Sequence, residues 1–419
     1  MKKSNTITSE KYLEEKAVHK AEKLAIIKKE NKTMKYSEFY KNEIACTVDS
    51  EVKNIQYGCD ECILPVNYTF GDYKKHEGQT KCKFCRDFKE PEFKGKKEFI
   101  KEVNLKKGEK IGITVSGGKD SMFAWYYLVN CFGSENVVAF NHKKTGLVHP
   151  LATKNLNVAK EILKTELIVI EDKGMLTRFK KNFEALLNNP SPEMVRVALC
   201  AGCRFGITEA LYSKGDELGI KKYVSAASYL ELAPFKEELL TQKGYGDDKV
   251  GLMEGLKVND CYDFDDNLIY ILRDHEYKYK GKLSCGDDKI TMFKNYELFD
   301  LDKYMANTPQ QIEEFVIENL NWVRPERSWH YDCLIEEIKD VLYYGMLGYT
   351  ESDFKLSAMV RHKLITSEEA KYQIEIVRSM IRNSFPQTVE FFRSVGLDHL
   401  VGKMSEFYET SKYLASPFA

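Results

Sequence analysis

The sequence predicts an α/β protein built on a doubly wound parallel sheet. Short apolar runs at 111–115, 137–140, 165–170 and 222–226 have the length of buried strands, and helical stretches separate them. Strands and helices that alternate in this way form a parallel sheet covered on both faces. A run of small residues, Ser-Gly-Gly-Lys-Asp-Ser, follows the first strand directly. It lies where the ligands of such sheets bind, at the carboxyl ends of the strands.

Composition sets the broad class. A chain of 419 residues is long enough for two or three domains. Its 63 basic and 64 acidic residues are balanced, so the overall charge does not indicate a nucleic-acid or membrane-surface binder. No stretch of about 18 apolar residues predicts a membrane span, and no signal peptide follows the N-terminal lysines. We therefore expect a cytoplasmic protein without a membrane partner. Eleven cysteines in such a protein favour metal or redox chemistry over disulfides.

The pattern along the chain divides it into four expected segments. These are an appended helical segment (1–57), a four-cysteine module resembling a zinc ribbon (58–90), the α/β domain (91–300) and a helical C-terminal domain (301–419). Within the third segment, residues 236–300 are rich in aspartate and poor in helical signals. We interpret that stretch as an insertion or a lid.

Two Cys-x-x-Cys pairs predict a zinc site in the second segment. The four residues are Cys59, Cys62, Cys82 and Cys85, with 19 residues between the pairs. Four thiolates at this spacing can surround Zn²⁺ tetrahedrally, at about 2.3 Å each. The module holds few aliphatic residues, so bound metal would supply its folding energy. Zinc is expected here rather than an iron cluster, because paired knuckles in a short ribbon are most often zinc sites.

The small-residue segment Ser116–Ser121 predicts a phosphate-binding loop. A turn between strand and helix lets backbone N–H groups close on an anion, and the helix N-terminus adds its dipole. The spacing differs from that of the Walker loop. It resembles the PP-loop of the ATP pyrophosphatases, the adenine nucleotide alpha-hydrolase-like superfamily. The resemblance implies a Rossmann-like fold, cleavage of ATP to AMP and pyrophosphate, and adenylation of a carbonyl oxygen or a carboxylate. The residues expected to bind ATP are Ser116, Gly117, Gly118, Lys119, Asp120 and Ser121.

Two charged residues of this loop are candidate catalytic groups. Lys119 can offset the charge that develops on the leaving pyrophosphate. Asp120 is placed either to bind Mg²⁺ beside the phosphates or to cap the following helix, and the residues alone leave both readings open. Adenine would lie after the second strand, near 140–142, with His142 and His149 as candidate general bases.

A second Cys-x-x-Cys pair, Cys200 and Cys203, forms a further candidate catalytic site. We expect it at a loop–helix junction, before a helix that begins near Arg204, where the helix N-terminus lowers thiol pKa values. Together with Cys285, the pair is similar to the three cysteines that hold a [4Fe–4S] cluster in tRNA thiolation enzymes, where one iron stays open to sulfide. The alternative for Cys285 is a buried apolar thiol. The remaining lone cysteines, interpreted as packing residues, are Cys46, Cys131, Cys261 and Cys333.

A further sequence motif lies in the C-terminal region. It runs through Asp353–Arg361, which contains Leu-Ser, and Leu364–Ala370, which contains Ile-Thr and Glu-Ala. Four motifs of this chain follow the order found in a known family: the cysteine ribbon, the PP-loop, Cys200–Cys203 followed by Arg204 and Phe205, and this C-terminal motif. In this order the chain resembles the N-acetyl sugar amidotransferases of bacterial surface-polysaccharide biosynthesis. The resemblance implies ATP-dependent conversion of an acetamido group, on a sugar nucleotide or sugar acid, to an acetamidino group. Ammonia from a separate glutaminase subunit would displace AMP.

Two other functions stay open. Amide and thioamide formation share the adenylation step, so the main alternative is an iron–sulfur-dependent sulfurtransferase with a sulfur donor as partner. Its acceptor would be a small-molecule amide or, less favoured, a tRNA base. A zinc-ribbon binding module with a degenerate ATP site belongs to a different class, and the intact loop speaks against it. We also expect a homo-oligomer. Substrate binding, partner binding and packing are all open for Trp322, Arg324, Arg327, Trp329 and Arg361.

Overall fold

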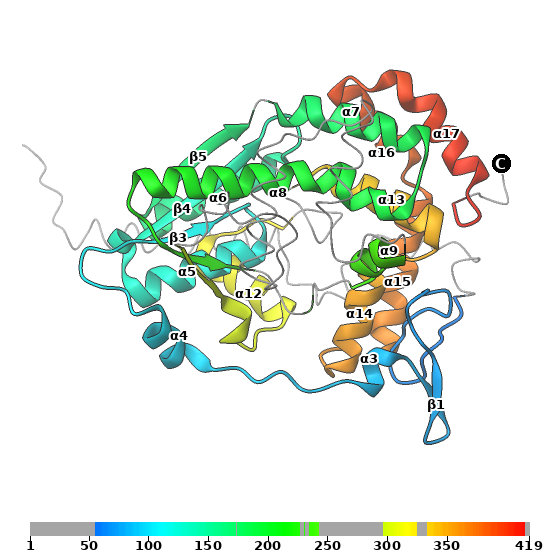
Figure 1. Cartoon of the computed structure of the whole chain (residues 1–419), viewed down its shortest axis with the longest axis horizontal. Helices are drawn as coiled ribbons and strands as arrows, with labels where there is room; N and C mark the ends of the chain where they lie inside the picture. Colours follow the sequence, from blue (N-terminus) through cyan, green and yellow to red (C-terminus); the bar gives the residue numbers. More distant parts are fainter. Residues whose placement is uncertain are drawn as a thin grey trace, which may run out of the picture.

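The structure is a computed structural model that describes residues 55–172, 174–226, 230, 234–242, 296–324 and 333–414. Figure 1 shows the central sheet towards one end of the molecule and a group of helices towards the other. Apart from 55–57, the expected N-terminal helical segment lies outside the described residues, and so does most of 236–300.

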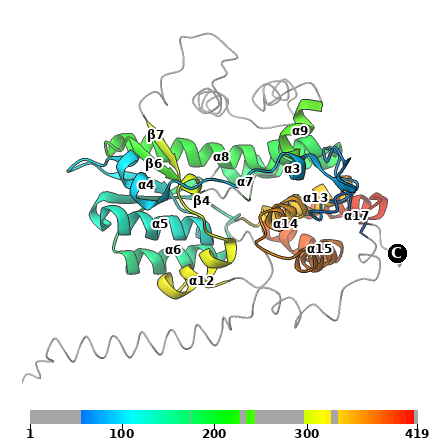
Figure 2. The same ribbon diagram turned by 90° about the horizontal axis from the view of Figure 1, so that it is seen from below.

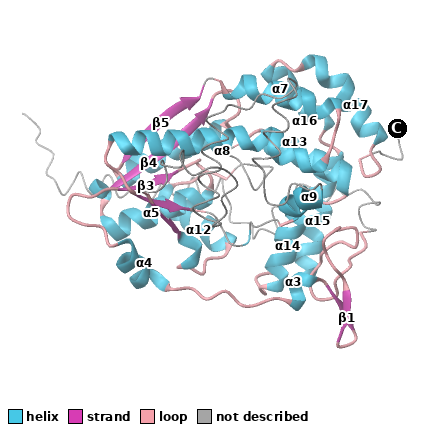
Figure 3. Cartoon of the chain, in the orientation of Figure 1, coloured by secondary structure: helices cyan, strands magenta, loops and turns pink. Residues whose placement is uncertain are grey.

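Five parallel strands form the central sheet, in the order β5-β4-β3-β6-β7. Figure 3 shows β5, β4 and β3 side by side in magenta. Their bounds are β3 Ile111–Thr114, β4 Val137–Lys144, β5 Glu166–Asp172, β6 Lys222–Ser225 and β7 Glu297–Asp300. The chain adds β4 and β5 on one side of β3, and then β6 and β7 on the other. The predicted doubly wound α/β fold is therefore confirmed.

One strand was not predicted. β7 lies at the end of the stretch interpreted as an insertion or a lid, and its sequence Glu-Leu-Phe-Asp is short and charged at both ends. It nevertheless pairs with β6 along its whole length, from Lys222 opposite Glu297 to Ser225 opposite Asp300. An edge strand needs only one paired neighbour, so it carries a weaker apolar signal than the inner strands.

Successive residues of the inner strands face two different cores. Val137 and Ala139 of β4 belong to one cluster of buried residues, and Val138 and Phe140 belong to another. Because side chains alternate along a strand, a sheet that is covered on both faces buries every residue of its inner strands. This is why the predicted strands are continuously apolar.

Helices cover both faces of the sheet (Figure 2). On one face lie α5 (Lys119–Phe132), α6 (Pro150–Leu163) and α12 (Pro309–Leu320), and on the other lie α7 (Met175–Asn188) and α8 (Pro192–Glu217). α4 (Gly95–Val103) precedes β3, and α9 (Phe235–Gln242) packs against α8. Short 3₁₀ turns are η2 (Ser134–Asn136), η5 (Leu301–Lys303) and η6 (Asp398–Leu400). No helix within the described residues combines the length and apolar composition needed to cross a membrane.

The described residues after 333 are helical, as their pattern predicts. The helices are α13 (Ile335–Leu347), α14 (Glu351–Arg361), α15 (Ser367–Arg382), α16 (Phe385–Val395) and α17 (Val401–Thr410). Capping boxes begin two of them, Thr350 with Asp353 at α14 and Thr366 with Glu369 at α15. Arg378 of α15 also forms an ion pair with Asp353, and this buried pair ties the start of α14 to α15.

The cysteine module contains the hairpin β1 (Lys74–His76) and β2 (Gln79–Lys81) and the short helix α3 (Lys83–Arg86). Glu77 and Gly78 form its turn with φ of 52° and 82°, as a two-residue hairpin turn with the right twist requires. The four cysteines belong to the same buried cluster as residues of α13 and α14. The module therefore shares a core with the C-terminal helices, beside which it lies in Figure 1.

Candidate active site and metal centre

The loop Ser116–Ser121 joins the central strand β3 to α5, at the point where β3 lies between β4 and β6. Its own serine hydroxyls hold its shape. Ser121 Oγ donates to Gly118 O at 2.9 Å and accepts the Ser116 N–H at 3.2 Å, and Ser116 Oγ accepts the Gly118 N–H at 3.3 Å. The strand–loop–helix arrangement predicted from the sequence is present, and such a turn at a helix N-terminus is suited to an anion.

Gly117 has no room for a side chain. Its φ of 91° is left-handed, and a Cβ there would lie 2.4 Å from Ala152 O of α6. Its carbonyl accepts the indole N–H of Trp322 at 2.9 Å, and Trp322 is only 1% exposed. Beside this contact, Asn155 of α6 binds both backbone groups of Val323, at 3.1 Å and 2.9 Å. The loop is thus held between α6 and the segment that follows α12, and Trp322 packs there.

Lys119 and Asp120 form an ion pair at the start of α5. Lys119 Nζ lies 2.5 Å from Asp120 Oδ2, and the lysine side chain is 7% exposed. Gly118 occupies the N-cap position and Asp120 lies inside the helix, so the helix-capping alternative for Asp120 is wrong. Asp120 Oδ1 is buried, with no hydrogen-bond partner among the described residues. An orphaned carboxylate oxygen beside a phosphate-binding loop fits Mg²⁺, which prefers oxygen ligands.

A second ion pair lies near the loop. Arg324 Nε is 3.2 Å from Glu313 Oε1 of α12, and both side chains are largely buried. Burial raises the pKa of Glu313, Arg324 and Lys119 oppose that rise, and Asp120 adds to it. Glu313 therefore lies within electrostatic range of both charged loop residues. The sequence did not point to Glu313. A functional acidic residue on an amphipathic helix has the same pattern as the ordinary acidic residues of its solvent-exposed face.

Residues 140–142, where adenine is expected, do not follow the second strand as predicted, because β4 continues to Lys144. Asn141 Nδ2 donates to Val115 O at 2.7 Å, and His142 is buried. His149 caps α6, since its Nδ1 accepts the Leu151 N–H at 3.2 Å, and burial lowers its pKa. A neutral imidazole that accepts at Nδ1 carries its proton on Nε2. The Nδ1 atom of His149 is therefore occupied by the cap of α6.

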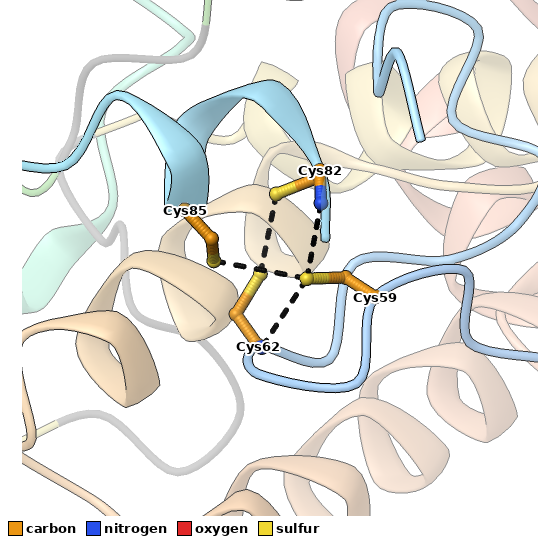
Figure 4. A group of neighbouring side chains, drawn as sticks. All are labelled: Cys59, Cys62, Cys82 and Cys85. Atoms are coloured by element: carbon orange, nitrogen blue, oxygen red, sulfur yellow. Dashed lines mark hydrogen bonds between the residues drawn. The ribbon is translucent and has the colours of Figure 1, made fainter. Parts of the chain in front are cut away.

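The four cysteines of the predicted zinc site come together, as Figure 4 shows. All are buried, and their Sγ atoms lie within 4.8 Å of one another. Cys59 and Cys85 are 3.7 Å apart, as are Cys62 and Cys82. Ligands about 2.3 Å from a tetrahedral zinc ion stand about 3.8 Å from one another, so the spacing fits a single ion. A [4Fe–4S] cluster places four irons between its ligands and needs a wider arrangement.

Backbone donors surround one sulfur atom of this site, that of Cys59. The backbone N–H groups of Cys62 and Cys82 lie 3.5 Å and 3.3 Å from Cys59 Sγ. Hydrogen bonds with the thiols of Cys62, Cys82 and Cys85 lower the pKa of Cys59 well below its ordinary value. Thiolates are the form that binds metal, so these donors favour the ligand state of Cys59.

A buried cation faces this thiol cluster. Arg361, at the end of α14, donates from Nη1 to Cys62 Sγ at 3.6 Å and to Cys85 Sγ at 4.0 Å. Its guanidinium lies over the rings of Phe84 and Phe354, 5.6 Å and 5.7 Å from their centroids. A divalent ion with four thiolates carries excess negative charge, which Arg361 would offset. The C-terminal helices thus supply a charge partner to the candidate metal centre.

The second Cys-x-x-Cys pair does not lie at a loop–helix junction. Cys200 and Cys203 lie inside α8, which begins at Pro192 and not near Arg204. Pro192, in the first turn after Ser191, signals the start of this helix, and the prediction from the cysteine spacing did not use that signal. The helix dipole acts in the first turn, so the predicted position of the pair at a helix N-terminus is wrong.

One buried lysine interacts electrostatically with this pair. Both thiols are half-buried against the larger core. Burial lowers the pKa of Lys339 on α13, but Glu336, Glu351 and Cys200 together raise it well above its ordinary value. Cys200 therefore lies within electrostatic range of a buried lysine. Cys131 and Cys333 are half-buried against the cores, as packing residues would be, while the cysteines outside the described residues are Cys46, Cys261 and Cys285.

No protein-family model matches this sequence, and no curated protein matches it. Among solved structures, the chain is similar to the NH3-dependent NAD synthetase of Campylobacter jejuni, with 19% identity and a TM-score of 0.27 over 46% of this chain and 95% of that one. It is similar to the U34-tRNA thiolase NcsA of Methanococcus maripaludis with its [4Fe–4S] cluster, with 16% identity and a TM-score of 0.29 over 83% and 89%. The NMN synthetase of Francisella tularensis gives 14% identity and a TM-score of 0.24 over 54% and 90%. At this level of similarity, function is inferred from this chain's own residues.

We expect Gly117→Ala to destabilise the fold and Gly118→Ala to leave its stability nearly unchanged. A left-handed φ costs a non-glycine residue about 1–3 kcal/mol, and the clash with the Ala152 carbonyl adds to it. Gly118 has a φ of −73°, and a Cβ there would meet only Ser116 Oγ, at 3.4 Å. Urea denaturation measures the free energy of unfolding of each variant. Equal values for the two would contradict the left-handed conformation of Gly117.

We expect Cys82→Ser to reduce both the metal content and the stability of the protein. Removing one of four thiolates weakens binding of the ion, and a structural ion contributes its binding energy to folding. The measurements are metal per chain by elemental analysis and the thermal midpoint of unfolding. Cys131→Ser is the matched control, because Cys131 is a half-buried thiol outside the cluster. A Cys82→Ser protein with full metal content would show that the ion is held elsewhere.

Proposed function

We propose that this chain is an ATP-dependent, AMP-forming enzyme of the PP-loop type that adenylates an amide or carbonyl oxygen and then transfers nitrogen to the activated carbon. The observation that carries the proposal is the loop Ser116–Ser121, a left-handed glycine turn between the central strand and α5, with Lys119 and Asp120 at its end. A turn of this shape at the switch point of a doubly wound sheet is suited to the phosphates of a nucleotide.

The charged groups of the loop suit the adenylation step. The acceptor oxygen attacks the α-phosphorus of ATP, the bond to the β-phosphate oxygen breaks, and pyrophosphate leaves with the electron pair. Lys119 would offset the charge on that leaving group, and Asp120 Oδ1 would hold Mg²⁺. When bound, Mg²⁺ supplies positive charge beside the phosphate oxygens. Most of the rate then comes from positioning and from neutralising phosphate charge.

The second half-reaction transfers nitrogen. Ammonia adds to the carbon of the O-adenylated amide, a proton is lost, and AMP leaves with the former amide oxygen, so that an acetamido group becomes an acetamidino group. The motif order supports an N-acetylated sugar nucleotide or sugar acid as acceptor and a separate glutaminase as the source of ammonia. Such a reaction belongs in the cytoplasm, where ATP and sugar nucleotides are made. We assign Zn²⁺ at Cys59, Cys62, Cys82 and Cys85 a structural role, because all four ligands are buried protein thiols.

We expect Lys119→Met to slow pyrophosphate release by about 10²- to 10³-fold, the effect of removing one preorganised electrostatic donor. The assay follows pyrophosphate from ATP in the presence of ammonium and a panel of N-acetylated sugar nucleotides and sugar acids. Lys107→Met is the control, because Lys107 is exposed and precedes β3, at the other end of the strand from the loop. A wild-type protein that releases no pyrophosphate with any acceptor would sink the proposal.

A second candidate is sulfur insertion on the same adenylated intermediate. What favours it is the pair Cys200 and Cys203, one helical turn apart on α8, half-buried, with Cys200 near the buried Lys339. With Cys285, the pair would hold a [4Fe–4S] cluster whose open iron carries sulfide. The acceptor would then become a thioamide, or less favourably a thiolated tRNA base.

Metal analysis separates the two candidates. Protein purified without oxygen should contain zinc and no iron or acid-labile sulfide if nitrogen is transferred, even after anaerobic reconstitution. About four irons and four sulfides per chain, lost in Cys200→Ser and Cys203→Ser but kept in Cys131→Ser, would instead favour sulfur insertion.

A further inference from the structure

The segment after α12 lies against the phosphate-binding loop. The Trp322 indole N–H binds Gly117 O at 2.9 Å, and both backbone groups of Val323 bind Asn155. Two consecutive residues are thus held by side-chain hydrogen bonds, one to the loop itself and one to the helix that supports it. The next residue along the chain is Arg324.

A carboxylate already holds the guanidinium of Arg324. Its Nε lies 3.2 Å from Glu313 Oε1, with the two side chains 16% and 13% exposed. Glu313 belongs to α12, which packs on α5 through Phe315, whose ring centroid is 5.2 Å from that of Phe123. The Glu313 carboxyl feels the charges of both Lys119 and Asp120. The two ion pairs, Lys119–Asp120 and Arg324–Glu313, therefore lie within electrostatic range of each other.

We infer that Arg324 is a second phosphate-binding cation of this site, which contacts the β- and γ-phosphates of ATP and the pyrophosphate that leaves. This rests on the proposed function, since it requires that the loop binds ATP. Glu313 holds the guanidinium in place before the nucleotide arrives. An anion entering the loop repels the Glu313 carboxylate and attracts Arg324, so part of the contact is exchanged for phosphate oxygens.

The loop needs a second cation to neutralise the charge of a bound triphosphate. Lys119 is paired with Asp120 at 2.5 Å, so part of its charge is offset before any nucleotide binds. A triphosphate brings several negative charges, more than one paired lysine can neutralise. A guanidinium has five N–H donors in a planar fork, so it can keep a carboxylate contact and bind phosphate oxygens at the same time.

The test is nucleotide binding by Arg324→Gln, measured by calorimetry with Mg²⁺–ATP, pyrophosphate and AMP as separate probes. We expect affinity for ATP and for pyrophosphate to fall by about 10- to 100-fold, the usual worth of a hydrogen bond to a charged group. Affinity for AMP should stay at the wild-type value, because AMP lacks the phosphates that Arg324 contacts. Arg324→Lys should recover part of the loss, since the charge remains.

Glu313→Gln is the matched control, because it tests whether the Arg324–Glu313 pair has a purely structural role. Its amide oxygen can still accept from Arg324 Nε, but the negative charge that competes with phosphate is gone, so we expect its ATP affinity to be higher than that of the wild type. Equal losses of ATP affinity in Glu313→Gln and Arg324→Gln would overturn the inference, because the pair would then serve only to hold α12 in place. Loss of AMP binding in Arg324→Gln, or unchanged ATP binding in that variant, would overturn it as well. A wild-type protein that binds neither ATP nor pyrophosphate would refute the proposed function itself.

Discussion

The contacts of Gly117 are the constraint on which the rest of the site depends. Its left-handed backbone brings the loop against Ala152 of α6, and its carbonyl accepts the Trp322 indole N–H. Three parts of the chain therefore meet at one peptide: the turn after β3, the start of α6 and the segment after α12. Any side chain at this position would push them apart. The position of Lys119, Asp120 and the N-terminus of α5 relative to a bound phosphate follows from this close approach.

The charges around the loop come as pairs rather than as an excess of cations. Lys119 is paired with Asp120, and Arg324 with Glu313. Buried single charges are costly, so each cation is held by an acid in the absence of ligand. A phosphate bound as we propose would compete with a carboxylate for each of these cations. Such pairing would orient the cations before a nucleotide binds.

The C-terminal motif at 353–361 and 364–370, which contributes to the family resemblance, has structural roles in this chain. Asp353 caps α14 and binds Arg378, and Thr366 with Glu369 caps α15. Arg361 faces the sulfur atoms of Cys62 and Cys85. These roles explain why such residues stand at such spacings around the cysteine module. They connect the candidate metal centre to the helices on which it packs, and the substrate is not needed to account for them.

The sequence by itself determined the features that depend on residues close together along the chain. Continuous apolar runs specify strands buried on both faces, a small-residue turn specifies the loop, and two Cys-x-x-Cys pairs specify the four-thiol site, because neighbouring residues carry these signals. The tertiary structure alone decided which distant groups complete the site. Trp322 and Gly117 are 205 residues apart, and Asn155 and Val323 are 168 apart. It also placed Cys200 and Cys203 inside α8 and paired β7 with β6. A lone tryptophan, asparagine or glutamate carries no periodicity, so only the folded chain shows what it touches.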